Sequence, residues 1–221
     1  MIYKILSYFY PITISKSTSA VSKTLEVTWN NGKLVLDTEN ANYSYGSLQR
    51  ILRRGLAEIG TEKIRSFEHV LVLGVAAGSV IHTLYNEIGF TGHVLGVDLD
   101  PQVIEIANKH FGLSAFKNLK MTCADAEAFI KDNTTKYDLI VVDIFQDTSM
   151  PEFVYNESFT NGLDSSLKSC GAVLFNTMVS DSPSKDRNLE YIKRMEQKKF
   201  TVSHLQKVDE HNELIVCFKK S

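Results

Sequence analysis

Three aspartates follow strand-like runs, at positions where a carboxylate can bind a ligand or move a proton. Asp98 ends "HVLGVD", Asp125 follows "LKMTCA" and Asp143 ends "YDLIVVD". In open α/β sheets, ligands bind beyond the carboxyl ends of the strands, where acids of this kind usually take part in the chemistry. The pattern therefore predicts one ligand-binding edge that carries all three acids.

The stretch "HVLVLGVAAGSV" predicts a buried strand that ends in a loop of small residues. Gly74 can adopt a positive φ at the end of the strand, and Gly78 lets backbone approach a ligand where the next helix starts. Ala76 and Ala77 are small enough to leave the same approach open. Asp98 follows Gly78 by about 20 residues, the separation at which an acid meets ribose hydroxyls. We therefore predict a nucleoside site with Asp98 on the ribose.

The other acids each allow a second interpretation. Asp125, followed by Ala126, is placed either to accept the exocyclic amine of adenine or to cap the helix that begins there. Asp100 precedes a proline, which is typical of a helix N-cap. Asp147, four residues after Asp143, also suits a turn.

The elements that must position these residues are indicated by hydrophobic periodicity. "TLEVTWNNGKLVLD" alternates polar and apolar residues around "NNG" and predicts a β-hairpin over residues 24–37. "GSLQRILRRGLAEIG" has helical spacing and stops at Gly60. From residue 69 strands alternate with helices, which predicts a parallel sheet with helices on both faces. The expected helices cover about residues 79–88, 101–110, 125–131, 157–168 and 185–198.

The final 23 or so residues break that alternation. "KFTVSHL" and "NELIVCF" are strand-like runs with no helix between them, which predicts an antiparallel hairpin at the end of the sheet.

Composition narrows the class of partner. The 24 basic and 26 acidic residues give a formal net charge of −2, so no overall field attracts the protein to nucleic acid or to an anionic membrane. We expect a small-molecule partner. Cys123, Cys170 and Cys217 are widely spaced in apolar contexts, which predicts buried thiols. The same cysteine pattern fits a reducing compartment, and we expect a cytoplasmic protein because the N-terminal stretch is too short to cross a bilayer and has no small-residue cleavage site. The six histidines form no metal-like cluster, so we predict no metal site.

The N-terminal stretch "MIYKILSYFYPITIS" is apolar but too short to cross a bilayer. It is typical of a segment that covers core or a subunit contact. Together with the exposed strands of the hairpin it predicts a homodimer.

Taken in order, these segments resemble the spermidine synthases and spermidine synthase-like proteins of the class I S-adenosylmethionine (SAM)-dependent methyltransferase fold. The resemblance covers about residues 24 to 219 and rests on Val72-Leu73-Gly74, Asp98-Leu99-Asp100-Pro101, Asp125-Ala126 and Tyr137-Asp138 through Asp143. It implies an α/β, Rossmann-like sheet of five parallel strands plus a C-terminal antiparallel hairpin. A small N-terminal β-hairpin module (residues 1–46) would precede the SAM-binding domain (residues 47–221).

The resemblance also implies roles for individual residues. The cofactor, SAM or decarboxylated SAM, would be bound by Gly74, Ala76, Ala77, Gly78, Asp98, Leu99, Asp125 and Ala126. Asp143 matches the family's catalytic acid, which would hold an amine acceptor and take its proton. Tyr45 and Asp147 are the other candidate catalytic residues.

Several positions depart from the family pattern. Ala77 replaces the acid that would hold the amine of decarboxylated SAM and repel the carboxylate of intact SAM, so intact SAM is the expected donor. On the acceptor side, one extra residue separates Asp143 from Asp147, and Gly46 replaces a glutamine. "KVDEHNE" stands where the family has a tyrosine-rich segment, which argues against a putrescine pocket.

The predicted function is therefore transfer of a methyl or aminopropyl group to a small, amine-bearing acceptor, with a polyamine as one candidate. Two alternatives stay open: a true spermidine synthase that uses decarboxylated SAM and putrescine, and a non-catalytic SAM-binding or dimerising protein. A NAD-linked dehydrogenase is disfavoured because the loop lacks the full G-x-G-x-x-G spacing.

Overall fold

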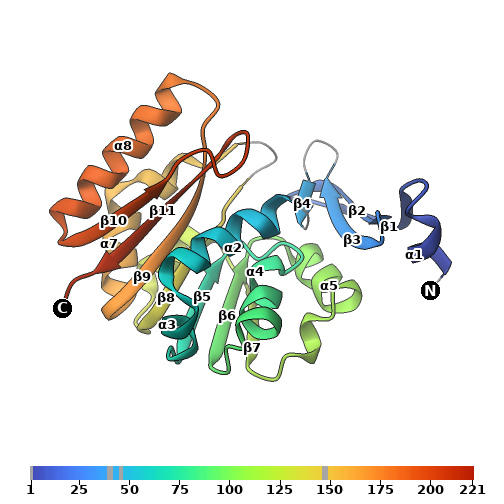
Figure 1. Cartoon of the computed structure of the whole chain (residues 1–221), viewed down its shortest axis with the longest axis horizontal. Helices are drawn as coiled ribbons and strands as arrows, with labels where there is room; N and C mark the ends of the chain where they lie inside the picture. Colours follow the sequence, from blue (N-terminus) through green and yellow to red (C-terminus); the bar gives the residue numbers. More distant parts are fainter. Residues whose placement is uncertain (1, 39–41, 45–46, 146–148) are drawn as a thin grey trace.

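The computed structural model describes residues 2–38, 42–44, 47–145 and 149–221 of the chain (Figure 1). A seven-stranded sheet forms its centre. Its strands are β5 (His69–Leu73), β6 (His93–Asp98), β7 (Leu119–Cys123), β8 (Tyr137–Val142), β9 (Leu167–Met178), β10 (Phe200–Leu205) and β11 (Asn212–Lys219). Their spatial order is β10-β11-β9-β8-β5-β6-β7. Strands β5 to β9 pair in parallel, whereas β11 is antiparallel to both β9 and β10, so the predicted fold class is confirmed.

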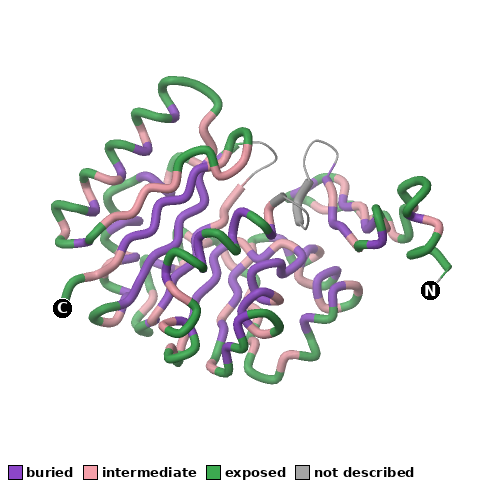
Figure 2. Tube along the Cα trace, in the orientation of Figure 1, coloured by how far each residue is buried: buried purple, intermediate pink, exposed green. Residues whose placement is uncertain are grey.

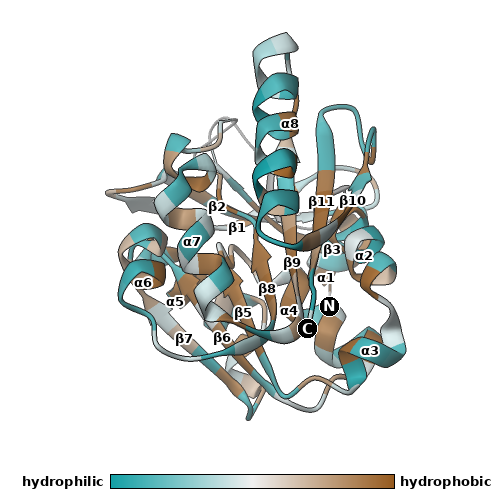
Figure 3. Ribbon diagram, turned by 90° about the vertical axis from the view of Figure 1, so that its left-hand side faces the viewer, coloured by the Kyte–Doolittle hydropathy of each residue, from teal (hydrophilic) through white to brown (hydrophobic). Residues whose placement is uncertain are grey.

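Helices cover both faces of this sheet (Figure 3). One face carries α2 (Ser47–Ile59), α3 (Thr61–Arg65) and α4 (Ser79–His82), which continues as a π-helix, η1 (Thr83–Ile88). The other carries α6 (Ala126–Asp132), α7 (Glu157–Ser166) and α8 (Ser182–Gln197). The remaining helices are α1 (Ile2–Leu6), α5 (Pro101–His110) and the 3₁₀ turns η2 (Leu113–Ala115) and η3 (Glu152–Tyr155).

Burial explains why the central strands are uniformly apolar. Residues 139–142 of β8 are Leu-Ile-Val-Val, and all four are 0% exposed because helices cover both faces of a parallel strand (Figure 2). Leu56 and Leu174 belong to the core on the α2 face, whereas Val173 and Tyr191 belong to the core on the α8 face. The sheet therefore divides the interior into two apolar layers.

The N-terminal residues form a second, four-stranded antiparallel sheet in the order β1-β2-β3-β4. Its strands are β1 (Ile12–Ser19), β2 (Lys23–Asn30), β3 (Lys33–Thr38) and β4 (Asn42–Ser44). Asn31 and Gly32 both have positive φ, 48° and 73°, as a tight turn between β2 and β3 requires. The predicted hairpin is confirmed, and the flanking strands β1 and β4 extend it.

This small sheet shares a core with the large domain. Leu25, Val27 and Leu36 cluster with Ala77 of the loop after β5 and with Val103, Ile106 and Phe111 in and after α5. The division of the chain at residue 46 remains a prediction.

Two sequence-based expectations were wrong in detail. Cys123 and Cys170 are exposed, and only Cys217 is buried. Cys123 ends β7 at the edge of the sheet, and Cys170 lies at an irregularity in the β8–β9 register with a positive φ of 63°, so neither thiol faces the core. The expected helix over residues 79–88 begins as α4 and changes to the wider π-helix at Thr83. No helix among the described residues has the length and apolar character needed to span a membrane.

Candidate functional site

The ends of six neighbouring strands form one polar edge of the large sheet. In spatial order they present Asn212 at the start of β11, Asn176 near the end of β9, Asp143 after β8, the 74–78 loop after β5, Asp98 at the end of β6 and Asp125 after β7. Residues distant in sequence meet here because parallel strands end at the same edge.

The loop after β5 depends on glycine at two positions. Gly74 has a φ of +83°, and a Cβ there would lie 2.1 Å from the backbone oxygen of Asp143. Gly78 has a φ of +84°, and its Cβ would meet the side chain of Leu113 at 2.6 Å. The positive φ is the main reason for glycine at position 78, and a Cβ there would also require the Leu113 side chain to shift. Ala76, with a φ of +49°, adopts a conformation that is uncommon without glycine.

Asp98 holds this loop in shape. Its Oδ2 accepts hydrogen bonds from the backbone N–H groups of Val75 and Ala76, both at 3.0 Å, and its Oδ1 accepts one from Asp100 N–H at 3.0 Å. Burial raises the pKa of Asp98, although these three donors favour its ionised form. A carboxylate has about four lone-pair sites, so the three backbone donors leave Asp98 with about one further acceptor site.

The far end of the edge combines apolar and polar groups. Leu99, directly after β6, is 42% exposed. Asp125 is exposed, and its Oδ1 accepts the N–H of Ala128 at 2.9 Å, so it is an N-cap of α6. Asp100 likewise caps α5 through Gln102 N–H, as the sequence predicts.

Ala77 is fully buried. Its methyl group belongs to the apolar cluster formed with the N-terminal sheet and α5, where Leu25 and Val103 are neighbours. A carboxylate in place of this methyl group would have to be accommodated beside that cluster. Ala76 and Ala126 keep partial exposure.

Asp143 lies directly beside the loop. Its backbone N–H donates to Leu73 O at 2.9 Å, and its Oδ1 accepts from the Asn176 side-chain amide at 2.8 Å. Burial raises the pKa of Asp143 to about 6, and the hydrogen bond from Asn176 opposes that rise. The carboxylate is therefore ionised near neutral pH but within reach of protonation.

The other two candidate catalytic residues, Tyr45 and Asp147, lie outside the described residues. Sequence reasoning missed Asn176, which donates to Asp143, and Asn212, which donates to Asn176; the pairing of β8, β9 and β11 brings these residues together. Their position at the ends of strand-like runs was the available signal.

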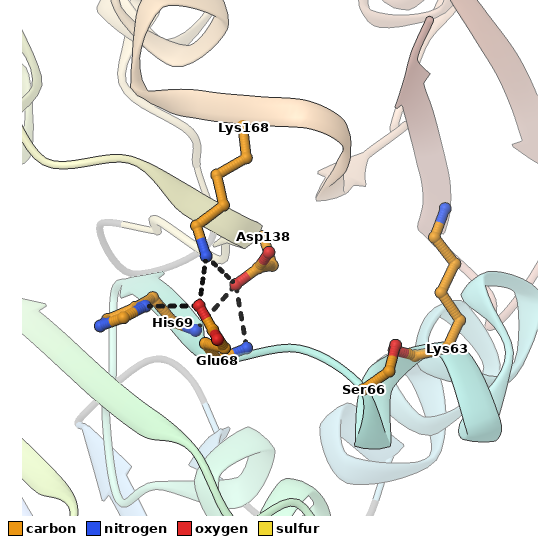
Figure 4. Close-up of polar contacts among 6 residues, drawn as sticks. All are labelled: Lys63, Ser66, Glu68, His69, Asp138 and Lys168. Atoms are coloured by element: carbon orange, nitrogen blue, oxygen red, sulfur yellow. Dashed lines mark hydrogen bonds and ion pairs between the residues drawn. The ribbon is translucent and has the colours of Figure 1, made fainter. Parts of the chain in front are cut away.

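A cluster of charged side chains lies at the opposite edge of the sheet, where the parallel strands begin (Figure 4). We call this the amino edge. Ligand atoms of Glu68, His69 and Asp138 lie within 4.8 Å of one another, an arrangement that sequence spacing did not indicate. The Lys168 ammonium sits among them, 3.1 Å from Glu68 Oε2 and 3.0 Å from Asp138 Oδ2. A lysine therefore supplies the positive charge at this cluster.

Comparison with known proteins places this geometry in a family. A family model described as a methyltransferase domain matches residues 64–217, more than half of the chain. The chain belongs to the methyltransferase-domain family. Within that family, the expected resemblance to spermidine synthase-like proteins of the class I fold is confirmed by the relatives that follow.

This methyltransferase-domain protein is 31% identical to the polyamine aminopropyltransferase of Vibrio vulnificus over 113 residues, which are 50% of this chain and 38% of that protein. The match thus spans well under half of the curated relative. The spermidine synthase of Thermotoga maritima superposes with a TM-score of 0.71 at 14% identity, covering 94% of this chain and 72% of that one. Human methyltransferase-like protein 13, solved in complex with SAH, superposes with a TM-score of 0.65 at 21% identity. The superposition covers 80% of this chain and 83% of that one. At these identities the two structures show the fold.

Proposed function

We propose that this protein binds SAM, or its decarboxylated form, along the carboxyl edge of the large sheet. It transfers a methyl or aminopropyl group from the sulfonium to a small amine acceptor. The nucleoside occupies the half of the edge made by the 74–78 loop, Asp98, Leu99 and Asp125, and the acceptor occupies the half around Asp143.

The observation that carries the proposal is the contact between Gly74 and Asp143. The missing Cβ of Gly74 leaves room for the Asp143 backbone, so the acid is fixed next to the loop that would hold the nucleoside. An acceptor held by Asp143 would then lie beside the sulfonium, and positioning of this kind supplies much of the rate enhancement in group transfer.

The chemistry assigned to Asp143 is that of a general base. The amine nitrogen attacks the carbon on the sulfonium, the carbon–sulfur bond breaks with its electron pair returning to sulfur, and the neutral thioether leaves. The proton released from the amine passes to the ionised Asp143 carboxylate. A pKa of about 6 keeps this carboxylate charged at neutral pH.

Two donors are considered, and different observations favour each. Ala77 lacks the carboxylate that would repel intact SAM, which supports methyl transfer. The Vibrio vulnificus relative named above is a polyamine aminopropyltransferase, which supports decarboxylated SAM and a polyamine acceptor. We favour intact SAM, because Ala77 is a residue of this chain itself, whereas aminopropyl transfer is the activity of a relative.

Titration calorimetry with both donors separates these possibilities. Intact SAM should bind at least as tightly as decarboxylated SAM, and Asp98→Ala should weaken binding by about 1.5–3 kcal/mol, the scale of hydrogen bonds to a charged group. A wild type that strongly prefers decarboxylated SAM and converts putrescine would instead be a spermidine synthase. Absence of binding to both donors would overturn the proposal.

The exposed thiols give an independent reading of where the donor binds. Cys123 Sγ lies 3.6 Å from Leu99 O, inside the proposed nucleoside half, whereas Cys170 is exposed in the amino-terminal part of β9. Saturating donor should slow alkylation of Cys123 and leave that of Cys170 unchanged. Equal rates at Cys123 with and without donor would place the nucleoside elsewhere. Binding without transfer to any amine would indicate a non-catalytic SAM-binding protein.

A further inference from the structure

Asp143 is the first member of a chain of side-chain hydrogen bonds across three neighbouring strands. Asn176 Nδ2 donates to Asp143 Oδ1 at 2.8 Å, and Asn212 Nδ2 donates to Asn176 Oδ1 at 3.0 Å. The parallel register makes the first contact possible because Val142 pairs with Phe175, so the next residues along β8 and β9 are neighbours. The second contact crosses the antiparallel pair of β9 and β11.

The two contacts fix which end of the Asn176 amide faces the acid. Asn176 is 0% exposed, so a polar atom without a partner would be costly. If the amide were rotated by half a turn, its oxygen would face the Asp143 carboxylate and its nitrogen would face the Asn212 donor. Both contacts would then be lost. Because an ionised carboxylate can only accept, the Asp143 contact selects the nitrogen end of the Asn176 amide, and Asn212 supports this orientation by donating to the Asn176 oxygen on the other side.

We propose that Asn176 and Asn212 are positioning residues that hold the Asp143 carboxylate by Oδ1, in its ionised form, so that Oδ2 faces the acceptor amine. This inference rests on the proposed function of Asp143. Asn176 acts directly on the acid, and Asn212 acts through Asn176.

The surroundings of Asp143 leave few other groups that could set its protonation. Asp98 lies at the end of β6, and Glu213 of β11 pairs with His204 at 2.7 Å and with Asn188 at 3.2 Å. Among the described residues none of these charges contributes to the shifted pKa of Asp143. Tyr45 and Asp147 lie outside the described part of the chain, so the full-length protein is needed for the test.

Carbon-13 NMR of aspartate-labelled protein measures the proposed effect without any substrate. The Asp143 carboxyl resonance is the one missing from Asp143→Asn. Removing the donor in Asn176→Ala should raise the titration midpoint of Asp143 by about 1 pH unit, as expected for loss of one charge-assisted hydrogen bond. Asn212→Ala should raise it by less, because the Asn176 amide can then rotate but is still present.

Thr177→Val is the matched control. Thr177 is the next residue on β9 and equally buried, but its hydroxyl donates to Glu213 O rather than to the acid. The titration midpoint of Asp143 in Thr177→Val should equal that in the wild type. An unchanged midpoint in Asn176→Ala would overturn the proposal, and an unchanged midpoint in Asn212→Ala would remove Asn212 from it. Should Asn176→Ala fail to fold, the test rests on Asn212→Ala, at a half-buried position, and an unchanged Asp143 midpoint in that variant would then overturn the proposal.

The pH dependence of kcat/KM separates this inference from the proposed function. In Asn176→Ala the acid limb should move to higher pH in parallel with the NMR midpoint, while the donor affinity stays at the wild-type value. Shifted midpoints in a protein that transfers to no amine would leave the positioning chain standing and refute the function. Active variants whose Asp143 midpoints and pH profiles match those of the wild type would refute the positioning role of Asn176 and Asn212 and leave the proposed function standing.

Discussion

At the scale of single residues, Asp143 carries an electrostatic cost that a neutral side chain would avoid. Burial raises its pKa from 3.8 to about 6, so the folded protein binds this proton more tightly than the unfolded chain does. A raised folded-state pKa means that stability falls as pH rises between the two values, and that the loss is complete above about pH 6.

Asp143→Asn should therefore raise the free energy of unfolding at pH 7, by up to about 3 kcal/mol for a shift of this size. The gain should shrink as pH falls through 6 and vanish below about pH 4, where the wild-type acid is protonated in both states. Urea denaturation across this range measures it, with the exposed Asp132→Asn as control. Transfer should be abolished. If the difference in the free energy of unfolding between Asp143→Asn and the wild type were no larger at pH 7 than at pH 4, it would contradict a raised pKa for Asp143.

At the scale of elements, hydrogen bonds to a buried acid join the N-terminal sheet to the large domain. Asp100 is 2% exposed, and its Oδ2 accepts from Ser19 Oγ at 2.5 Å and from Ser22 Oγ at 2.8 Å. The same residue caps α5 and donates its N–H to Asp98. The turn between β1 and β2 is therefore linked to the residue predicted to bind ribose.

Ser22→Ala should destabilise the protein by about 1–2 kcal/mol, because a buried carboxylate loses one of its donors. Urea denaturation measures the loss, and limited proteolysis should show faster cleavage within residues 12–38. Thr18→Ala, at an exposed position of β1, is the control and should have little effect. If both variants behave like the wild type, the sheet is held by its apolar cluster alone.

The amino edge of the large sheet is joined by ion pairs instead. Burial of Asp138 would raise its pKa, but hydrogen bonds from His69 N–H, Lys168 and Glu68 N–H outweigh that effect and lower it. A lowered folded-state pKa means that the stabilisation is present above the unfolded value, about 3.9, and is lost as pH falls through the folded value.

Lys168→Met should accordingly cost about 1–2 kcal/mol at pH 7, the scale of a hydrogen bond between charged groups. The difference from wild type should narrow as pH falls below the unfolded value and through the lowered pKa of Asp138, where the acid becomes protonated. Thermal or urea unfolding at pH 7 and pH 3 provides the comparison, and the exposed Lys131→Met is the control. A cost that is the same at both pH values would show that Lys168 acts through packing and not through its charge.

At the scale of the whole molecule, the N-terminal segment and the C-terminus lie at opposite ends of the long axis (Figure 1). The N-terminal end presents a group of exposed aromatic side chains: Tyr3 is 54% exposed, Tyr8 62%, Phe9 82% and Tyr10 56%. Strand β1 is an edge of its sheet, and exposed edges and apolar groups of this kind usually mark a contact surface.

We therefore keep the prediction of a homodimer and assign the contact to this surface. Replacing Phe9 and Tyr10 by serine should weaken the dimer, since both side chains are more than half exposed in the single chain. Light scattering of wild type and variant at about 10–50 micromolar, a range suited to specific dimers, tests this. A wild-type protein that is monomeric at these concentrations would refute the predicted homodimer.

Local patterns in the sequence determined most of the secondary structure and half of the candidate site. Asn31-Gly32 specified the hairpin because few residues tolerate positive φ at both turn positions. Asp100 followed by Pro101 specified the start of α5 in the same local way. The contact between the 74–78 loop and Asp98 was predictable because the loop and the acid are separated by a fixed length of chain.

Only the tertiary structure decided what each acid contacts. Asn176 is far from Asp143 in sequence and donates to it, and Asn212 donates to Asn176, because β8, β9 and β11 are neighbours in the sheet. The burial of Ala77 under the N-terminal sheet, and the Lys168 ammonium among Glu68, His69 and Asp138, have the same origin. Periodicity reports which face of an element is apolar, whereas partners across a sheet depend on strand order and register, which long-range packing selects.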